Sequence, residues 1–250
     1  MQNQIHSNTS KNNENPLNKN TLHKNPIHKQ NLGKIYFLNM DIASAMTLCG
    51  DMLEKCNLRA KEDNEICASI FGDEKDFGKF VAWCKGFFGS NVVFGDSLES
   101  IAIARLKSKG LLCATAESCT GGLLAYHFTR NAGVSQVFLG GVVSYDNAIK
   151  QRILGVRESS LEDFCAVSEQ VVSQMLCGAL ERFGAQVALA SSGIAGPSGG
   201  NAQKPVGTVF LGAQVAGEKP LIEQHFFAGT RIQIQEQSCQ KALEMLLKII

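Results

Sequence analysis

The chain has 250 residues, of which 44% are apolar and 19% are charged, and its formal net charge is +1 at pH 7. This balance is typical of a globular protein with one large or two small domains, and it excludes a fibrous or wholly disordered chain. A broadly basic surface for nucleic acid is not indicated. The charge is unevenly distributed along the chain. Residues 1–34 carry five Lys and one Glu, a net charge of +4, and the remaining residues carry a net charge of −3.

Targeting and covalent features narrow the class further. No run of about 18 apolar residues is present, so we expect no transmembrane helix and no membrane partner. The first residues lack the apolar stretch of a secretory signal. The nine Cys are odd in number, scattered, and without the spacing of a zinc site. We therefore expect reduced thiols in a cytoplasmic protein, with neither a metal nor a cofactor.

The first 95 residues contain no chemical motif. Residues 1–34 are rich in Asn and Lys and poor in apolar side chains, which predicts a disordered tail. Apolar residues then recur at helical spacing over 40–70 and 76–88, with one short strand at 91–94. We interpret residues 35–95 as a small, mostly helical region of unknown role.

Residues 96–250 show helices in alternation with apolar strands. This pattern predicts an α/β fold, a layered sandwich in which helices cover a mixed sheet. Helices are predicted at 97–109, 123–130, 146–153, 169–183 and 232–249, and strands at 111–116, 137–145, 187–190, 208–215 and 221–227.

The first candidate site is a strand-to-helix turn that reads Glu-Ser-Cys-Thr-Gly-Gly over residues 117–122. Free backbone N–H groups at a helix N-terminus favour an anion or a developing oxyanion. Ser118 is a nucleophile or a helix N-cap, and the pattern alone favours the N-cap. Cys119 is a rival nucleophile. No His lies close in sequence to complete a Cys–His pair.

The second candidate site joins Tyr145 to Lys150, which leave a strand end and enter a short helix. A desolvated lysine has a lowered pKa and can act as a base, with a phenol to relay or orient the proton. A surface lysine with a half-buried tyrosine is the plainer interpretation, and the pattern alone favours it. The spacing is one residue too long for a short-chain dehydrogenase, and no dinucleotide fingerprint precedes it.

The third candidate site is a glycine-rich loop over residues 193–207. Ser198 formally fits Gly-x-Ser-x-Gly, but no helix follows at once, so we do not expect a nucleophile there. A backbone-lined ligand cradle at the end of a strand and a flexible connector are equally consistent with the pattern.

The three segments occur in one order and together resemble a known family. They are Ala-Glu-Ser-Cys-Thr-Gly-Gly (116–122), Gly-Gly-Val-Val-Ser-Tyr (140–145) with Lys150 and Leu-Gly-Val (154–156), Ala-Val-Ser-Glu (166–169), and Gly-Ile-Ala-Gly-Pro (193–197) with Lys-Pro-Val-Gly (204–207). This combination resembles the CinA C-terminal domain family, the nicotinamide mononucleotide amidohydrolases. The likeness covers residues 97–250, and we take 96–250 as the domain.

The resemblance implies hydrolysis of the carboxamide of nicotinamide mononucleotide, a pyridine nucleotide, to nicotinate mononucleotide and ammonia. It also implies a homo-oligomer and places the catalytic groups at Ser118, Tyr145 and Lys150. As substrate-binding residues we expect Thr120, Gly121, Gly122, Gly141, Gly193, Ala195, Gly196, Lys204 and Arg231, where the guanidinium of Arg231 would anchor phosphate or carboxylate.

Three positions depart from the family pattern. Ser192 stands where Thr is usual, Thr230 stands where Asp commonly precedes the arginine, and Cys165 replaces a usual Gly. Two other functions stay open: a catalytically silent nucleotide-binding module, and a competence- or DNA-related protein. The absence of a basic stripe outside the tail and of an aromatic platform argues against nucleic acid.

Overall fold

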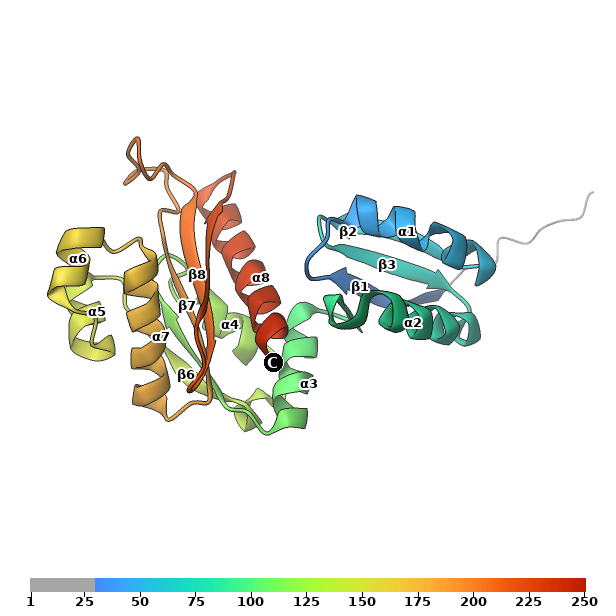
Figure 1. The fold of residues 1–250 in the computed structure, drawn as a ribbon, viewed down its shortest axis with the longest axis horizontal. Coiled ribbons are helices and arrows are strands. Elements are labelled where there is room, and N and C mark those ends of the chain that lie inside the picture. The colour runs from blue at the N-terminus through green and yellow to red at the C-terminus, as the bar shows by residue number, and fades with distance from the viewer. Residues whose placement is uncertain (1–29) are drawn as a thin grey trace, which may run out of the picture.

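The computed structural model describes residues 30–250, and the predicted disorder of residues 1–29 lies outside this range. The described chain forms two sheets, each with its own helices (Figure 1). We call residues 30–95 the N-terminal lobe and residues 96–250 the C-terminal lobe. Among the described residues, no helix combines the length and apolar composition needed to cross a membrane.

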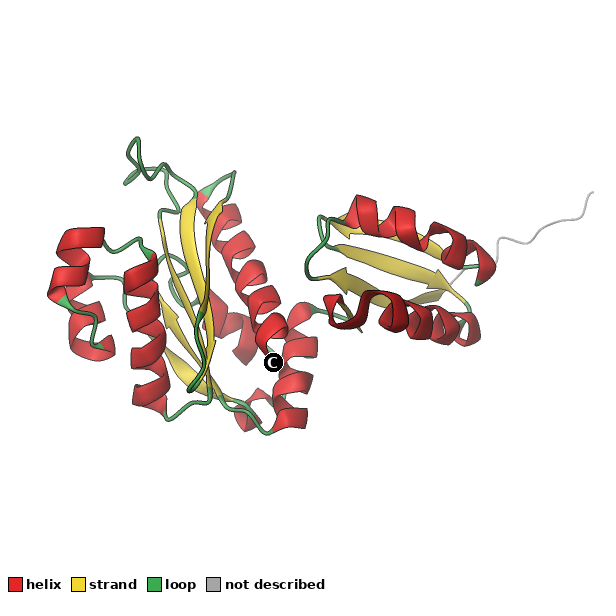
Figure 2. Cartoon of the chain, in the orientation of Figure 1, coloured by secondary structure: helices red, strands yellow, loops and turns green. Residues whose placement is uncertain are grey.

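The N-terminal lobe has the βαββαβ order of a ferredoxin-like unit. Its strands lie in the order β2-β3-β1-β4, and every pair is antiparallel. Both helices cover one face, where Ala45 and Phe80 pack with Phe37 and Ile70 (Figure 2). The elements are β1 (Gln30–Phe37), α1 (Ile42–Lys55), β2 (Arg59–Asn64), β3 (Cys67–Gly72), α2 (Glu74–Phe88), a 3-10 turn (Gly89–Asn91) and β4 (Val92–Gly95).

The prediction of a mostly helical region is therefore wrong for this lobe. Helix α1 occupies only the first half of the span 40–70 that was predicted as helical, because β2 and β3 follow there. Helix α2 and strand β4 lie close to the predicted 76–88 and 91–94. The sequence of β2, Arg-Ala-Lys-Glu-Asp-Asn, has only Ala60 out of full exposure, so it shows no apolar alternation. The predicted disordered tail of residues 1–34 is also too long, because β1 begins at Gln30, which pairs with Gly72.

The C-terminal lobe contains a five-stranded sheet in the order β6-β5-β7-β8-β9. Strands β6, β5 and β7 are parallel, and β8 and β9 are antiparallel. The elements are α3 (Leu98–Lys109), β5 (Cys113–Glu117), α4 (Leu123–Thr129), a 3-10 turn (Val134–Gln136), β6 (Phe138–Val143), α5 (Asn147–Leu154), α6 (Glu158–Phe164), α7 (Glu169–Phe183), β7 (Val187–Gly193), β8 (Thr208–Val215), β9 (Leu221–Phe226) and α8 (Arg231–Ile249).

Helices cover both faces of this sheet (Figure 2). On one face, Met175 and Leu176 of α7 pack against Ala188 of β7. On the other face, Leu243 of α8 packs with Leu189 of β7, together with residues of α3 and α4. The predicted α/β sandwich with a mixed sheet is thus confirmed. Ligands of such sheets bind at the carboxyl ends of the parallel strands.

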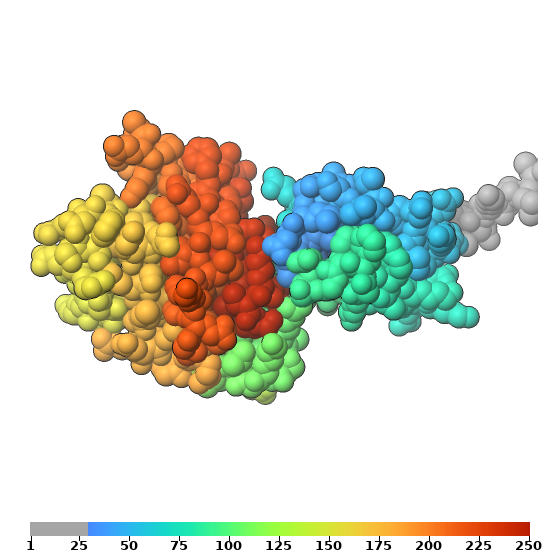
Figure 3. Space-filling view, in the orientation of Figure 1, coloured from blue at the N-terminus to red at the C-terminus, as the bar shows by residue number. Residues whose placement is uncertain are grey.

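The two lobes share a buried seam. The sheet face of the N-terminal lobe that its helices leave open carries Tyr36, Cys67 and Val93, and these side chains join the core of the C-terminal lobe. The phenol of Tyr36 donates to the carbonyl of Asp96 at 3.2 Å. Figure 3 shows the N-terminal lobe in contact with α8.

Candidate functional site

A pocket of about 220 Å³ lies at the carboxyl ends of the parallel strands. It brings together the three segments that the sequence analysis treated separately. The turn after β5 contributes Ser118, the β6–α5 connection contributes Tyr145, α5 contributes Lys150, and the end of β7 contributes Gly193. The complete lining is Ser118, Cys119, Tyr145, Asn147, Lys150, Ala166, Val167, Ser192, Gly193, Ala195 and Arg231.

Ser118 is placed by the sheet and not by a helix cap. Its N–H donates to the carbonyl of Ser191 at 2.9 Å, which extends the pairing of β5 with β7 by one residue. The N-cap of α4 is Gly122, with no side-chain cap. The N-cap interpretation of Ser118 is therefore wrong, and its hydroxyl, on a residue 9% exposed, lines the pocket.

The N–H groups at the start of α4 have a partner inside the protein. Glu117 accepts from the N–H of Gly122 at 2.9 Å, and the N–H of Gly121 donates to the carbonyl of Ser118 at 3.2 Å. The hydroxyl of Thr120 donates to Glu117 at 2.7 Å. None of Thr120, Gly121 and Gly122 lines the pocket, so the structure does not bring these three predicted substrate-binding residues to it.

Lys150 is buried to 1% exposure, which contradicts the surface-lysine interpretation. Its ammonium donates to the carbonyls of Ser144 at 2.7 Å and Tyr145 at 3.1 Å. Burial lowers the pKa of Lys150, and the negative charge of Asp146 opposes that shift only in part. A lysine with a lowered pKa holds a larger neutral fraction and can accept a proton.

Arg231, the first residue of α8, reaches across the mouth of the pocket. It donates to the phenol oxygen of Tyr145 at 2.9 Å and to the carbonyl of Gly196 at 2.8 Å. Tyr145 is 61% exposed, more than the half-buried position expected. The arrangement places a guanidinium beside the exposed phenol, where a negatively charged group of a ligand would find donors.

The rival nucleophile, Cys119, lies in a poor environment for a thiolate. It is 4% exposed, and burial raises the pKa of its thiol to about 12. Its carbonyl accepts from the amide of Gln235 on α8 at 2.8 Å. The thiol is therefore protonated at neutral pH, and the serine is the better candidate nucleophile.

The remaining predicted residues serve different purposes. Gly193 and Ala195 line the pocket, whereas Gly196 contributes only the carbonyl that holds Arg231. Lys204 donates to the carbonyls of Phe164 at 2.9 Å and Val167 at 2.7 Å, so it holds the segment that closes one side. Gly141 of β6 does not line the pocket. A Cβ at this position would lie 2.1 Å from the Thr115 hydroxyl, so the glycine allows β6 to pack closely against β5.

Sequence reasoning missed four lining residues. Asn147 and Ser192 adjoin predicted motifs and were within reach of the pattern. Ala166 and Val167 carry no chemical signal of their own. Their placement follows from hydrogen bonds that tie this segment to residues distant in sequence, including the bond from the Ser192 hydroxyl to the carbonyl of Ala166 at 2.7 Å.

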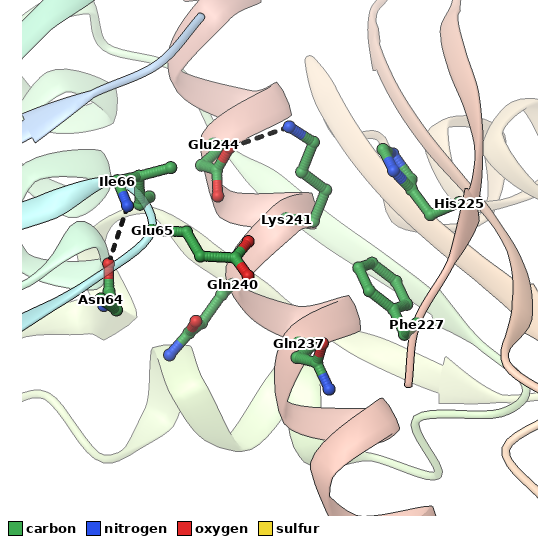
Figure 4. Close-up of a pocket in the computed structure, with 9 residues that line it drawn as sticks. All are labelled: Asn64, Glu65, Ile66, His225, Phe227, Gln237, Gln240, Lys241 and Glu244. Atoms are coloured by element: carbon green, nitrogen blue, oxygen red, sulfur yellow. Dashed lines mark hydrogen bonds and ion pairs between the residues drawn. The ribbon is translucent and has the colours of Figure 1, made fainter. Parts of the chain in front are cut away.

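A second cavity, of about 410 Å³, lies at the seam between the lobes (Figure 4). It is lined by the β2–β3 turn around Glu65 and by α8 and β9. It is larger than the first pocket, but it holds none of the predicted catalytic groups. Within it, Lys241 pairs with Glu244 at 3.0 Å, so two of its charged side chains neutralise each other. We therefore place the candidate active site at the smaller pocket.

Known proteins resemble the C-terminal lobe. A relative from Enterobacter agglomerans, the nicotinamide-nucleotide amidohydrolase PncC, is 48% identical over 145 residues, which cover 58% of this chain and 88% of that protein. A CinA-like protein of Thermotoga maritima is 42% identical over 155 residues, or 62% of this chain. The match covers 38% of that longer protein, so the chain spans little more than a third of such relatives.

Solved structures agree with the sequence matches. The competence/damage inducible protein CihA of Agrobacterium tumefaciens superposes with a TM-score of 0.60 at 42% identity, over 61% of this chain and 93% of that one. The CinA C-terminal domain family matches residues 95–250. The chain therefore belongs to the CinA family, and its C-terminal lobe is a CinA C-terminal domain.

Proposed function

We propose that the protein hydrolyses the carboxamide of nicotinamide mononucleotide, and so recycles pyridine nucleotides. The activity named for the Enterobacter agglomerans relative supports an amidohydrolase. The observation that carries the proposal is Lys150, a buried ammonium with a lowered pKa in the same pocket as the Ser118 hydroxyl. A serine with a lysine base is a recurrent means of acyl transfer from amides.

The proposed reaction proceeds in two halves. The Ser118 oxygen attacks the carboxamide carbon, and Lys150 takes the hydroxyl proton, directly or through Tyr145. The tetrahedral intermediate then expels ammonia, which leaves with that proton, and an acyl-enzyme remains. Water, deprotonated by the same base, cleaves the ester and releases the carboxylate product and free Ser118.

Arg231 supports recognition of an anionic substrate. Its guanidinium lies at the pocket and is already oriented by the carbonyl of Gly196 and the phenol of Tyr145. We assign it the phosphate of the nucleotide, because guanidinium groups bind phosphate bidentately. Asn147, an exposed lining residue, offers the substrate a side-chain amide.

Ammonia release from nicotinamide mononucleotide tests the proposal. The wild type is expected to release one equivalent per nucleotide, and Ser118→Ala is expected to release none above background. Ser198→Ala is the matched control, because Ser198 lies in an exposed loop and fits a nucleophile pattern, yet does not line the pocket. Binding of the nucleotide by the wild type without hydrolysis would support a silent nucleotide-binding module instead.

We also propose self-association. Strand β6 forms one edge of the five-stranded sheet, and its outward residues Leu139 and Val143 are 41% and 49% exposed. An open strand edge with apolar side chains favours pairing with another copy. Light scattering is expected to give a multiple of the 27.0 kDa chain mass, and Leu139→Glu is expected to lower the measured mass.

We also propose a cytoplasmic location. The nine Cys are all free, which supports a reducing compartment.

A further inference from the structure

The residue immediately before Ser118 is a buried carboxylate that lies outside the candidate pocket. Glu117 is 1% exposed and ends β5. One of its oxygens accepts from the hydroxyl of Thr120 at 2.7 Å and from the N–H groups of Gly122 at 2.9 Å and Leu124 at 3.0 Å. The other oxygen accepts from the N–H of Ala125 at 2.8 Å.

These bonds satisfy the groups that a helix N-terminus leaves without partners. Three N–H groups at the start of α4, which would otherwise point at solvent or a ligand, converge on one carboxylate. Bonds from N–H groups to an ionised acceptor are about twice as strong as neutral ones. Because Glu117 is the last residue of β5, an inner strand of the sheet, the whole turn over residues 118–122 is fixed to the sheet at both ends.

The same residue also connects to the second catalytic segment through its backbone. The carbonyl of Glu117 accepts from the N–H of Ser144 at 2.7 Å. The carbonyl of Ser144 in turn accepts from the ammonium of Lys150 at 2.7 Å. A short chain of hydrogen bonds therefore runs from the residue beside the candidate nucleophile to the candidate base.

We propose that Glu117 is a positioning residue, whose carboxylate holds the turn that carries Ser118 in the geometry needed for attack. The inference rests on the proposed function. It also implies that α4 does not offer its own N–H groups to the oxyanion, because Glu117 occupies them. Cys119 lines the pocket next to the nucleophile, and its N–H has no oxygen acceptor among the described residues, so we assign this N–H as the donor to the oxyanion.

Glu117→Gln tests the role of the charge. The amide keeps one acceptor oxygen but turns an NH2 group toward backbone N–H donors, so the bonds to one of the two oxygens are lost together with the negative charge. A misplacement of about 1 Å typically costs about 10²-fold in rate, and we expect kcat to fall by about that factor while KM changes little. Glu99→Gln is the matched control, because Glu99 is also buried and bonded to His127 and Arg130, but does not touch the turn. It is expected to lower Tm and leave kcat unchanged.

A readout independent of activity is amide hydrogen exchange. The N–H groups of Gly122, Leu124 and Ala125 are expected to be protected in the wild type and to exchange faster in Glu117→Gln. If that variant does not fold, Thr120→Val, which removes the hydroxyl that bonds to Glu117 and to Ser191, is expected to lower kcat by a smaller factor with KM unchanged.

Wild-type kcat in a folded Glu117→Gln, a loss confined to KM, or wild-type kcat in Thr120→Val would each overturn the role of Glu117. Failure of the proposed function is distinguishable, because there the wild type itself releases no ammonia. In that case, unchanged exchange of the three amides in Glu117→Gln would still refute the anchoring.

Discussion

Lys150 is the residue whose environment most directly shapes the chemistry. Its ammonium has two carbonyl partners but no carboxylate hydrogen-bonded to it among the described residues, and its side chain is out of water. Desolvation penalises the charged form and so lowers the pKa from the 10.5 of an ordinary lysine. A neutral amine is thereby accessible at a lower pH than in solution.

We expect the rate of nicotinamide mononucleotide hydrolysis to increase with pH. A general base works in its unprotonated form, so kcat/KM rises as the pH rises through the lowered pKa of Lys150 and levels off above it. The rising limb should lie below pH 10.5. The measurement is kcat/KM for ammonia release across a pH series. A rate that is flat, or that falls, over this range would remove Lys150 as the base.

Lys150→Arg separates the base from the positive charge. Arginine keeps a cation at this position but is not deprotonated in proteins. A positioned base contributes about 10²–10⁴-fold, so we expect kcat to fall by a factor in that range, with a folded protein by circular dichroism. Retention of wild-type kcat would show that a cation alone is sufficient there.

Cys165 adopts a backbone conformation that suits glycine. It ends α6 with φ 64° and ψ 164°, a region that non-glycine residues enter at a cost of about 1–3 kcal/mol. The neighbouring carbonyls hold it there, since Lys204 bonds to Phe164 and Val167. The glycine that the family resemblance leads us to expect at this position would adopt this conformation without that cost.

Cys165→Gly should therefore stabilise the protein. Relief of strain exceeds the entropic cost of glycine, about 0.5–1 kcal/mol, and we expect a net gain of about 1 kcal/mol in the free energy of unfolding, measured in urea. Cys177→Gly makes the same change at an exposed position of helix α7, and there we expect a loss. Equal effects at the two positions would contradict the strain argument.

The catalytic candidates and three of the predicted substrate-binding residues, Gly193, Ala195 and Arg231, line one pocket, but the contacts of the turn after Ser118 could not be predicted from sequence. Ser118, Tyr145 and Lys150 stand in motifs whose order is itself informative. Thr120 and Gly122 were assigned to the substrate because free N–H groups follow a strand-to-helix turn. The partner that satisfies them, Glu117, lies within the same motif, but no periodicity shows that its side chain folds back onto the helix.

At the scale of elements, the packing of α5 on α7 places Lys150. A Cβ built on Gly178 of α7 would lie 2.1 Å from the carbonyl oxygen of Leu154, the last residue of α5. The two backbones can approach this closely only because residue 178 has no side chain. In α1, by contrast, nothing lies within 4 Å of a Cβ built on Gly50.

Alanine at these two glycines should have opposite effects. Gly50→Ala is expected to stabilise the protein by about 0.5–1 kcal/mol, because alanine favours a helix. Gly178→Ala is expected to destabilise it by about 1–3 kcal/mol, because α5 has to move. Thermal unfolding measures both changes. Since α5 carries Lys150, kcat should also fall in Gly178→Ala, and a stabilised, fully active variant would refute the close contact.

A buried face of regular period is the signal by which sequence analysis found the long helices of the C-terminal lobe. Helix α7 spans the residues that the sequence predicts, 169–183, because Val171, Met175 and Leu176 recur on one face. Strand β2 was missed because it is an edge strand with polar side chains on both faces. Its existence depends on backbone pairing with β3, which leaves no pattern in the side chains.

At the scale of the whole molecule, α8 joins the two lobes to the candidate site. Its first turns carry Arg231 and Gln235, which contact Tyr145 and the turn after Ser118. Further along the helix, Lys241 and Glu244 line the seam cavity opposite the N-terminal lobe. One rigid helix thus contacts both the candidate active site and the lobe whose role the motifs do not explain.

This shared core predicts that the two lobes unfold together. Trp83, the single tryptophan of the sequence, lies on α2 and reports on the N-terminal lobe, whereas loss of ammonia release reports on the C-terminal lobe. Coincident transitions of the two signals in urea are the test of one cooperative unit. Two separated transitions in the wild type would contradict the prediction.

Two neighbouring valines of β4 provide the matched variants. Val92 is buried among the helices of its own lobe, and Val93 is buried in the seam, so Val→Ala removes the same volume from opposite faces. Each change should cost about 2 kcal/mol. In Val92→Ala, we expect both signals to shift together, because the seam is intact. In Val93→Ala, the weakened seam should let Trp83 fluorescence change at lower urea than activity is lost. Coincident signals in Val93→Ala, at the midpoint of the wild type, would show that the seam does not couple the lobes.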